Sequence, residues 1–135
     1  MSVKGVKDEF LKDEKLSLFA LKSFWEGFDA PGSTLKGVVI CRLPFVRQDD
    51  PLSKERDLRE AGAWKKYVLP AAVLETKQAL GRLIRKADDK GYVVFCDSRL
   101  DNMPYGTLFR ESFPSQNIKV LSREQIVDDV SKLDI

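Results

Sequence analysis

A glutamine and two arginines share one face of a helix predicted for the stretch QALGRLIRKADDKG, residues 78–91. At about 100° per residue, Gln78, Arg82 and Arg85 fall within roughly 60° of one another. The opposite face of this helix is apolar and consists of Leu80, Leu83, Ile84 and Ala87. A guanidinium is planar and offers its N–H donors as a fork that fits phosphate oxygens. The pattern therefore indicates a helix anchored by one side that presents phosphate-binding groups on the other.

Gly81 lies beside this polar stripe. A glycine inside a helix costs about 1 kcal/mol relative to alanine, and its missing side chain lets a partner approach the helix backbone. We therefore predict that Gly81 belongs to the binding face. The alternative is that Arg82 and Arg85 cover a solvated helix face and that Gly81 eases helix packing.

A second group of polar residues follows an apolar run, in the stretch SFWEGFDAPGS at residues 23–33. In open α/β sheets, ligands bind outside the carboxyl ends of the strands. This rule places Glu26, Gly27 and Asp29 at that edge of the sheet, and we expect the two arginines of the helix at the same edge. Residues that follow two further apolar runs should join them: Arg42, Pro44, Phe45, Asp97 and Arg99. The alternative is an ordinary turn with its two aromatic residues in the core.

The strands that would position these groups are three short apolar runs at residues 16–21, 37–41 and 92–96. They do not alternate with polar residues, which is typical of strands covered on both faces in a parallel sheet. Residues 117–121 are a weaker fourth candidate. Strands that alternate with helices predict an α/β fold with three layers, in which helices flank a mostly parallel sheet.

Four helices are predicted around these strands. Val3, Val6 and Phe10 have helical spacing, and Ser122 with Gln125 forms a capping box for a last helix. The remaining two signals are Asp50–Pro51, as cap and first turn of one helix, and Pro70, which opens another that extends to about Lys86. The last helix would carry an apolar face of Ile126, Val130 and Leu133.

Composition limits the classes of function. The chain has 135 residues, a formal charge of +2 and no histidine, so total charge does not argue for nucleic acid and imidazole chemistry is excluded. Cys41 and Cys96 lie within apolar runs, and we interpret both as reduced core residues. The charged N-terminus has no signal-peptide pattern, and no apolar run reaches membrane-spanning length. We expect one domain, residues 1–135, in the cytoplasm, with no metal site and no membrane contact.

Two nucleotide-binding motifs and the serine nucleophile motif of hydrolases are absent from the sequence. It contains no GxxxxGK[ST] phosphate loop, no GxGxxG and no GxSxG. Arginines without a phosphate loop predict half of a site whose other half lies elsewhere. A sheet of three or four strands is also small for this class, so we expect the domain to be incomplete at its N-terminal side.

Three stretches resemble, in the same order, a known family: SFWEGFDAPG, VVICRLPF and LPAAVLETKQALGRLIRKADDKGYVVFCDSR. They are similar to the C-terminal part of the second RecA-like domain of DinG/XPD-type superfamily 2 ATP-dependent DNA helicases. The resemblance covers roughly residues 10–114. In that family SFWEG is helicase motif V and QxxGRxIR is motif VI.

The resemblance implies a role for each candidate residue. In the family, ATP binds between two RecA-like domains, and the first domain supplies the phosphate loop and the Mg²⁺ site. Arg82 and Arg85 would be arginine fingers on the γ-phosphate, with Gln78 as a polar partner near it. Contacts with the bound nucleotide are implied for Glu26, Gly27, Asp29 and Gly81. Contacts with single-stranded DNA are implied for Lys22, Ser23, Phe24 and Trp25.

We therefore expect a motor portion of a DinG-like helicase of DNA repair or replication, which by itself neither hydrolyses ATP nor unwinds DNA. Its partners would be the first RecA-like domain and single-stranded DNA, and a homodimer could cover an exposed edge of the sheet. Two alternatives stay open. One is a standalone α/β interaction module without ATPase activity, and the other is a complete small nucleotide-binding protein.

Overall fold

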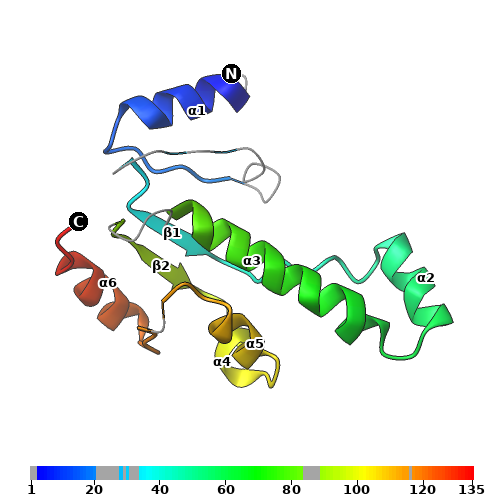
Figure 1. The fold of residues 1–135 in the computed structure, drawn as a ribbon. Helices are drawn as coiled ribbons and strands as arrows, with labels where there is room; N and C mark the ends of the chain where they lie inside the picture. The colour runs from blue at the N-terminus through cyan, green and yellow to red at the C-terminus, as the bar shows by residue number, and fades with distance from the viewer. Residues whose placement is uncertain (1–2, 21–27, 29, 31–33, 84–88, 116) are drawn as a thin grey trace.

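The computed structural model describes residues 3–20, 28, 30, 34–83, 89–115 and 117–135, and Figure 1 shows their arrangement. The elements follow in chain order as α1 (Val3–Lys12), β1 (Gly37–Ile40), α2 (Pro51–Arg59), η3 (Trp64–Val68), α3 (Leu69–Leu83), β2 (Tyr92–Phe95), α4 (Arg99–Asn102), α5 (Gly106–Glu111) and α6 (Arg123–Ser131). Of these, η3 is a π-helical turn that leads directly into α3.

The two strands pair in parallel, with Gly37 opposite Tyr92 and Ile40 opposite Phe95. Both were predicted from their apolar runs, and each is one residue shorter than the run. Helix α3 lies in the connection between them, packs against β1 and runs antiparallel to it (Figure 1). A strand–helix–strand unit of this kind confirms the α/β class, and a RecA-like fold fits it. The three-layer arrangement stays a prediction.

Two predicted strands are wrong within the described residues. Residues 16–20 and 117–121 have no strand structure, and residue 21 lies outside the described part. Phe19 is 96% exposed and Val120 is 74% exposed, so neither run is covered on both faces. A strand needs a neighbouring strand for its backbone hydrogen bonds, and in the described ranges neither run has one. Apolar composition alone therefore overestimated the sheet.

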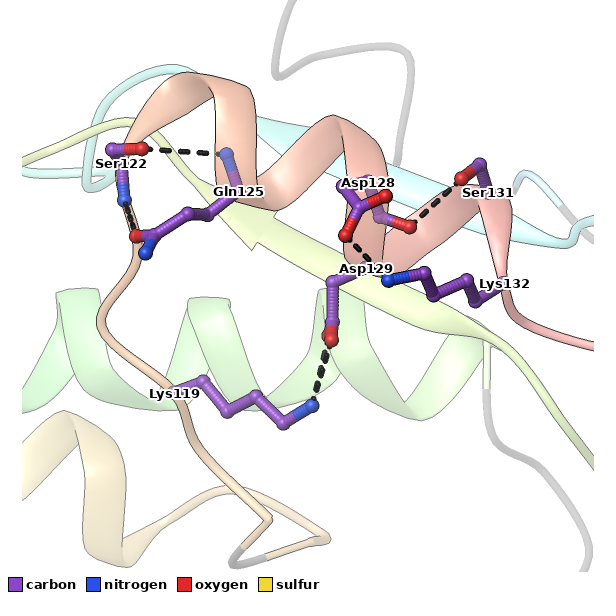
Figure 2. A network of polar contacts seen from close by, with 7 residues as sticks. All are labelled: Lys119, Ser122, Gln125, Asp128, Asp129, Ser131 and Lys132. Carbon is purple, nitrogen blue, oxygen red and sulfur yellow. Dashed lines mark hydrogen bonds and ion pairs between the residues drawn. The ribbon is translucent and has the colours of Figure 1, made fainter.

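The predicted starts of α2 and α6 are confirmed. The carboxylate of Asp50 accepts a hydrogen bond from the backbone N–H of Ser53 at 2.9 Å, with Pro51 in the first turn of α2. The capping box of α6 is present as predicted, because Ser122 and Gln125 exchange side-chain and backbone hydrogen bonds (Figure 2). Both caps satisfy amide groups that a helix leaves unpaired at its N-terminus.

Helix α3 begins close to Pro70, as predicted, but a π-helical turn precedes it. Proline lacks the N–H that would bond four residues back, and its ring crowds that carbonyl group. A wider turn, in which the N–H of Leu69 donates to the carbonyl of Trp64, accommodates this. The described part of α3 ends at Leu83, before residues 84–88, which lie outside the description.

The described core consists of two separate clusters. The larger one joins three parts of the chain: the segment after β1, the first turns of α3, and α5. Its buried residues are Leu43, Leu69, Ala72 and Phe109. The smaller one joins α1 to the segment before β1 through Phe10, Phe28 and Ala30. The rings of Phe10 and Phe28 lie 5.8 Å apart. The two clusters therefore fix opposite ends of the β1–α3–β2 unit.

The short helices α4 and α5 were not predicted. They pack tightly on each other at Gly106, where an added Cβ would lie 2.1 Å from the carbonyl oxygen of Leu100. Phe109 of α5 is fully buried in the larger cluster. Helices this short have no repeat of apolar spacing long enough to be recognised from sequence.

Candidate functional site

The end of α3 carries the described part of the predicted phosphate-binding face. Gln78 and Gly81 are exposed, and Arg82 is partly buried. Leu80, of the predicted anchoring side, is buried at 2% exposure. Ala79 is also buried, at 6%, although it lies only about 60° from Arg82 around the helix. The predicted division is therefore confirmed for Gln78 and Leu80.

Gly81 is open in the way that a binding role requires. A Cβ built on this residue meets no other atom within 4 Å. The packing of the described residues therefore does not explain why a glycine stands at this position in the helix. The space beside the backbone is open to a partner.

Arg82 is held by the segment that follows the predicted motif V. Its Nη1 donates a hydrogen bond to the backbone carbonyl of Phe28, at 2.5 Å. Phe28 is itself buried in the smaller cluster. This contact orients the guanidinium and joins two motifs that lie 54 positions apart in sequence. Sequence reasoning missed it, because a backbone carbonyl leaves no signature in residue types.

Eight of the predicted site residues lie outside the described residues. These are the second arginine of motif VI and the whole motif V group: Arg85, Lys22, Ser23, Phe24, Trp25, Glu26, Gly27 and Asp29. Their roles stay predictions. Phe28, which directly follows this motif, is described and contacts the motif VI helix.

The predicted location of Arg82 at the carboxyl edge of the sheet is wrong. The first turns of α3 pack near the carboxyl end of β1, through Leu69, Ala72 and Leu43. Because α3 runs antiparallel to the strands, its last turn, with Arg82, lies near their amino ends (Figure 1). A helix that connects two parallel strands must return to the edge where the second strand begins. Arg82 and the residues after the strands therefore lie at opposite edges of the sheet.

The carboxyl edge holds a separate polar group, as predicted for the residues after β1 and β2. The side chain of Asp97 is 7% exposed and accepts a hydrogen bond from the backbone N–H of Leu43 at 2.9 Å. Arg99 binds the same carboxylate with two nitrogens, Nε at 2.9 Å and Nη2 at 2.5 Å. The hydrogen bond from Leu43 to Asp97 connects the two chain segments beyond the last paired residues of β1 and β2.

The hydrogen bonds from Arg99 hold the pKa of the Asp97 carboxyl well below its usual range. Partial burial opposes this shift, and the N–H of Leu43 adds to it. The same hydrogen bonds raise the pKa of the Arg99 guanidinium. The pair is therefore charged at neutral pH. We call the Asp97–Arg99 pair, together with the bond from the N–H of Leu43, the carboxyl-edge clamp.

An aromatic cluster supports this clamp. The guanidinium of Arg99 lies 5.3 Å from the ring centre of Phe45. The Phe45 ring stacks on Trp64 at 5.6 Å and meets Tyr105 edge-on at 5.5 Å. The residues in these contacts are far apart in sequence. Of the contacts, the sequence predicted only that Phe45 would lie after its strand.

The two cysteines are not core residues, which corrects the interpretation made from their apolar runs. Cys41 and Cys96 are both exposed, and both are free thiols. Each lies one residue beyond the end of its strand. An apolar run that ends a strand does not bury its last residue when the face beyond it is open.

Two further findings concern binding partners. Within the described ranges, no cluster of His, Cys, Asp and Glu side chains is arranged to hold a metal ion. The helices described here are also too short or too polar to cross a membrane.

The parallel β1–α3–β2 unit, in which Arg82 lies near the described end of the helix, defines an α/β protein. Residues 1–116 match the family model of the helicase C-terminal domain. The chain belongs to this helicase C-terminal domain family. No solved structure gives a significant match.

Curated relatives are helicases of the YoaA and DinG type. The chain is 46% identical over 110 residues to "ATP-dependent DNA helicase YoaA" of Escherichia coli strain K12, which covers 78% of this chain and 17% of the relative. It is 37% identical over 117 residues to "ATP-dependent helicase DinG" of Mycobacterium tuberculosis, covering 84% and 18%. It is 36% identical over 121 residues to "3'-5' exonuclease DinG" of Bacillus subtilis, covering 87% and 13%. The chain thus spans less than a fifth of the length of these relatives.

Proposed function

We propose that this chain forms one wall of the ATP site in a DinG-type DNA helicase motor. Arg82 and Arg85 act as arginine fingers toward the γ-phosphate, and Gln78 is a polar partner near it. The opposite wall, with the phosphate loop and the Mg²⁺ ligands, belongs to a first RecA-like domain. The observation that carries this proposal is the exposure of Gln78 and Gly81, next to the partly buried Arg82, in a chain of the helicase C-terminal domain family.

The described residues fit a nucleotide phosphate chemically. Gln78 offers an amide group, Arg82 offers a guanidinium, and the open position at Gly81 lets a bulky anion approach the helix. When bound, ATP with Mg²⁺ supplies the phosphoryl group that is transferred. The protein residues bind and orient this group and offset its negative charge, which for an arginine finger is typically worth about 10³ to 10⁵ in rate.

The bond between Arg82 and the carbonyl of Phe28 supports a link between the two motifs. Glu26, Gly27 and Asp29 flank Phe28 in sequence and, in this proposal, couple the nucleotide to the DNA track. Lys22, Ser23, Phe24 and Trp25 contact single-stranded DNA through charge, hydrogen bonds and stacking. The carboxyl-edge clamp at Asp97 lies at the other end of the sheet, so it has no contact with nucleotide in this arrangement.

The finger assignment rests on the motif and not on the carboxyl-edge rule, which Arg82 does not follow. It also predicts that the isolated chain, without a phosphate loop, hydrolyses no ATP. Measurable turnover by the purified 135-residue chain would instead favour a complete small nucleotide-binding protein.

The decisive experiment uses a longer helicase that contains this domain. Arg82→Ala should lower kcat for ATP hydrolysis by about 10³-fold or more, and Arg82→Lys should recover little of it, because an ammonium lacks the planar fork. Lys77→Ala is the matched control, since Lys77 is an exposed cation on the same helix. Normal turnover by Arg82→Ala, with a melting temperature like that of the control, would refute the finger assignment.

A further inference from the structure

The two exposed cysteines each directly follow the last residue of a paired strand, Cys41 after β1 and Cys96 after β2. Ile40 is paired with Phe95, and the backbone N–H of Cys96 donates to the carbonyl of Ile40 at 3.0 Å. One step further, the N–H of Leu43 donates to the Asp97 carboxylate at 2.9 Å. Cys41 therefore lies opposite Cys96, between two lateral hydrogen bonds that hold the chains side by side.

The register also places both thiols on the same face of the sheet. Successive side chains along a strand point to opposite faces. Ile40 is 2% exposed and points into the core, whereas Val39 is 55% exposed on the other face. If the alternation is continued by one residue beyond the last strand pair, Ile40–Phe95, it puts Cys41 on the face of Val39 and Cys96 on the face of Val94. Both thiols are free and exposed, so a reagent in solution reaches them.

The spacing suits a covalent bond between them. Neighbouring strands lie about 4.8 Å apart, and disulfides join residues whose Cα atoms are about 4.4–6.8 Å apart. We propose that Cys41 and Cys96 are a thiol–disulfide redox pair that closes a reversible cross-strand disulfide. The proposal does not depend on the ATP site.

The oxidant is a low-molecular-weight disulfide such as glutathione disulfide. The thiolate of one cysteine attacks a sulfur of this reagent, forms a mixed disulfide and releases one glutathione thiolate. The second cysteine thiolate attacks the protein sulfur of the mixed disulfide and displaces the second glutathione. Two protein thiols are oxidised, one glutathione disulfide is reduced to two thiols, and no other reactant is needed. The new bond ties the ends of β1 and β2 next to the Leu43–Asp97 contact.

The test is intact-mass analysis of the purified chain after equilibration with glutathione disulfide and glutathione. The expected product has lost two hydrogens, carries no glutathione and returns to the dithiol with excess reductant. Cys41→Ser and Cys96→Ser are the controls, and each should keep one glutathione as a stable mixed disulfide. Stable attachment of two glutathiones to the wild-type chain, or covalent dimers as the main product, would overturn the proposal.

A second measurement separates folded geometry from mere sequence proximity. The equilibrium constant for disulfide formation should be about 10²- to 10³-fold higher in the folded chain than in concentrated urea, because the fold already brings the distant cysteines together. Equal constants in the two conditions would show that the strand pair does not hold the thiols within reach of each other.

Discussion

Replacing Gly81 by alanine should make the isolated chain more stable. Gly81 lies within α3, and an added Cβ meets nothing within 4 Å, so the substitution introduces no clash. Alanine is favoured over glycine in a helix by about 1 kcal/mol. The melting temperature of a domain of this size should then rise by about 4 °C.

Gly62→Ala is the matched control, because an added Cβ at Gly62 also meets nothing within 4 Å. The two positions differ in their backbone, since Gly62 has a φ of 78°. An alanine in this left-handed region costs about 1–2 kcal/mol. Chemical denaturation of both variants should therefore give changes of opposite sign in the free energy of unfolding.

The same substitution should weaken ATP hydrolysis in a longer helicase that carries this domain, if the open space at Gly81 admits nucleotide. Higher stability with lower kcat/KM would be the expected combination. A destabilised isolated chain would refute the reasoning about the open helix face. Unchanged hydrolysis would show that the open space at Gly81 does not serve nucleotide binding.

Two further predictions concern stability. Because folding lowers the pKa of the Asp97 carboxyl, its stabilising contribution is complete above the unfolded pKa of about 4 and is lost as the pH falls further. In urea unfolding, Asp97→Asn should therefore lose less of its free energy of unfolding on acidification than wild type. Identical pH profiles of the two proteins would contradict this. Ser122→Ala removes the capping box and should cost α6 about 1 kcal/mol. Since α6 has no buried residue, hydrogen exchange of its amides should accelerate while global melting stays unchanged, and a global loss of stability would be the contrary outcome.

Local signals in the sequence determined most of the helices. Caps and prolines act within one turn, so Asp50 and Ser122 specify helix starts without help from the rest of the chain. The two strands β1 and β2 were also predictable. Each is a short apolar run, and a predicted helix lies between the two runs in sequence, as in a pair of parallel strands. The family was recognised from three stretches that resemble it, which include motifs V and VI, and the family model matches the chain.

Tertiary structure decided which apolar runs became strands and where the polar groups lie. The run around Phe19 has the composition of a strand but no partner in the described part of the chain, and pairing is a long-range property. The edge at which Arg82 lies follows from the direction of α3 between two parallel strands. The Arg82–Phe28 and Leu43–Asp97 contacts, and the pairing of Ile40 with Phe95, each join residues more than 50 positions apart. Spacing along a chain does not encode such contacts, because they arise only when the strand register brings distant backbones together.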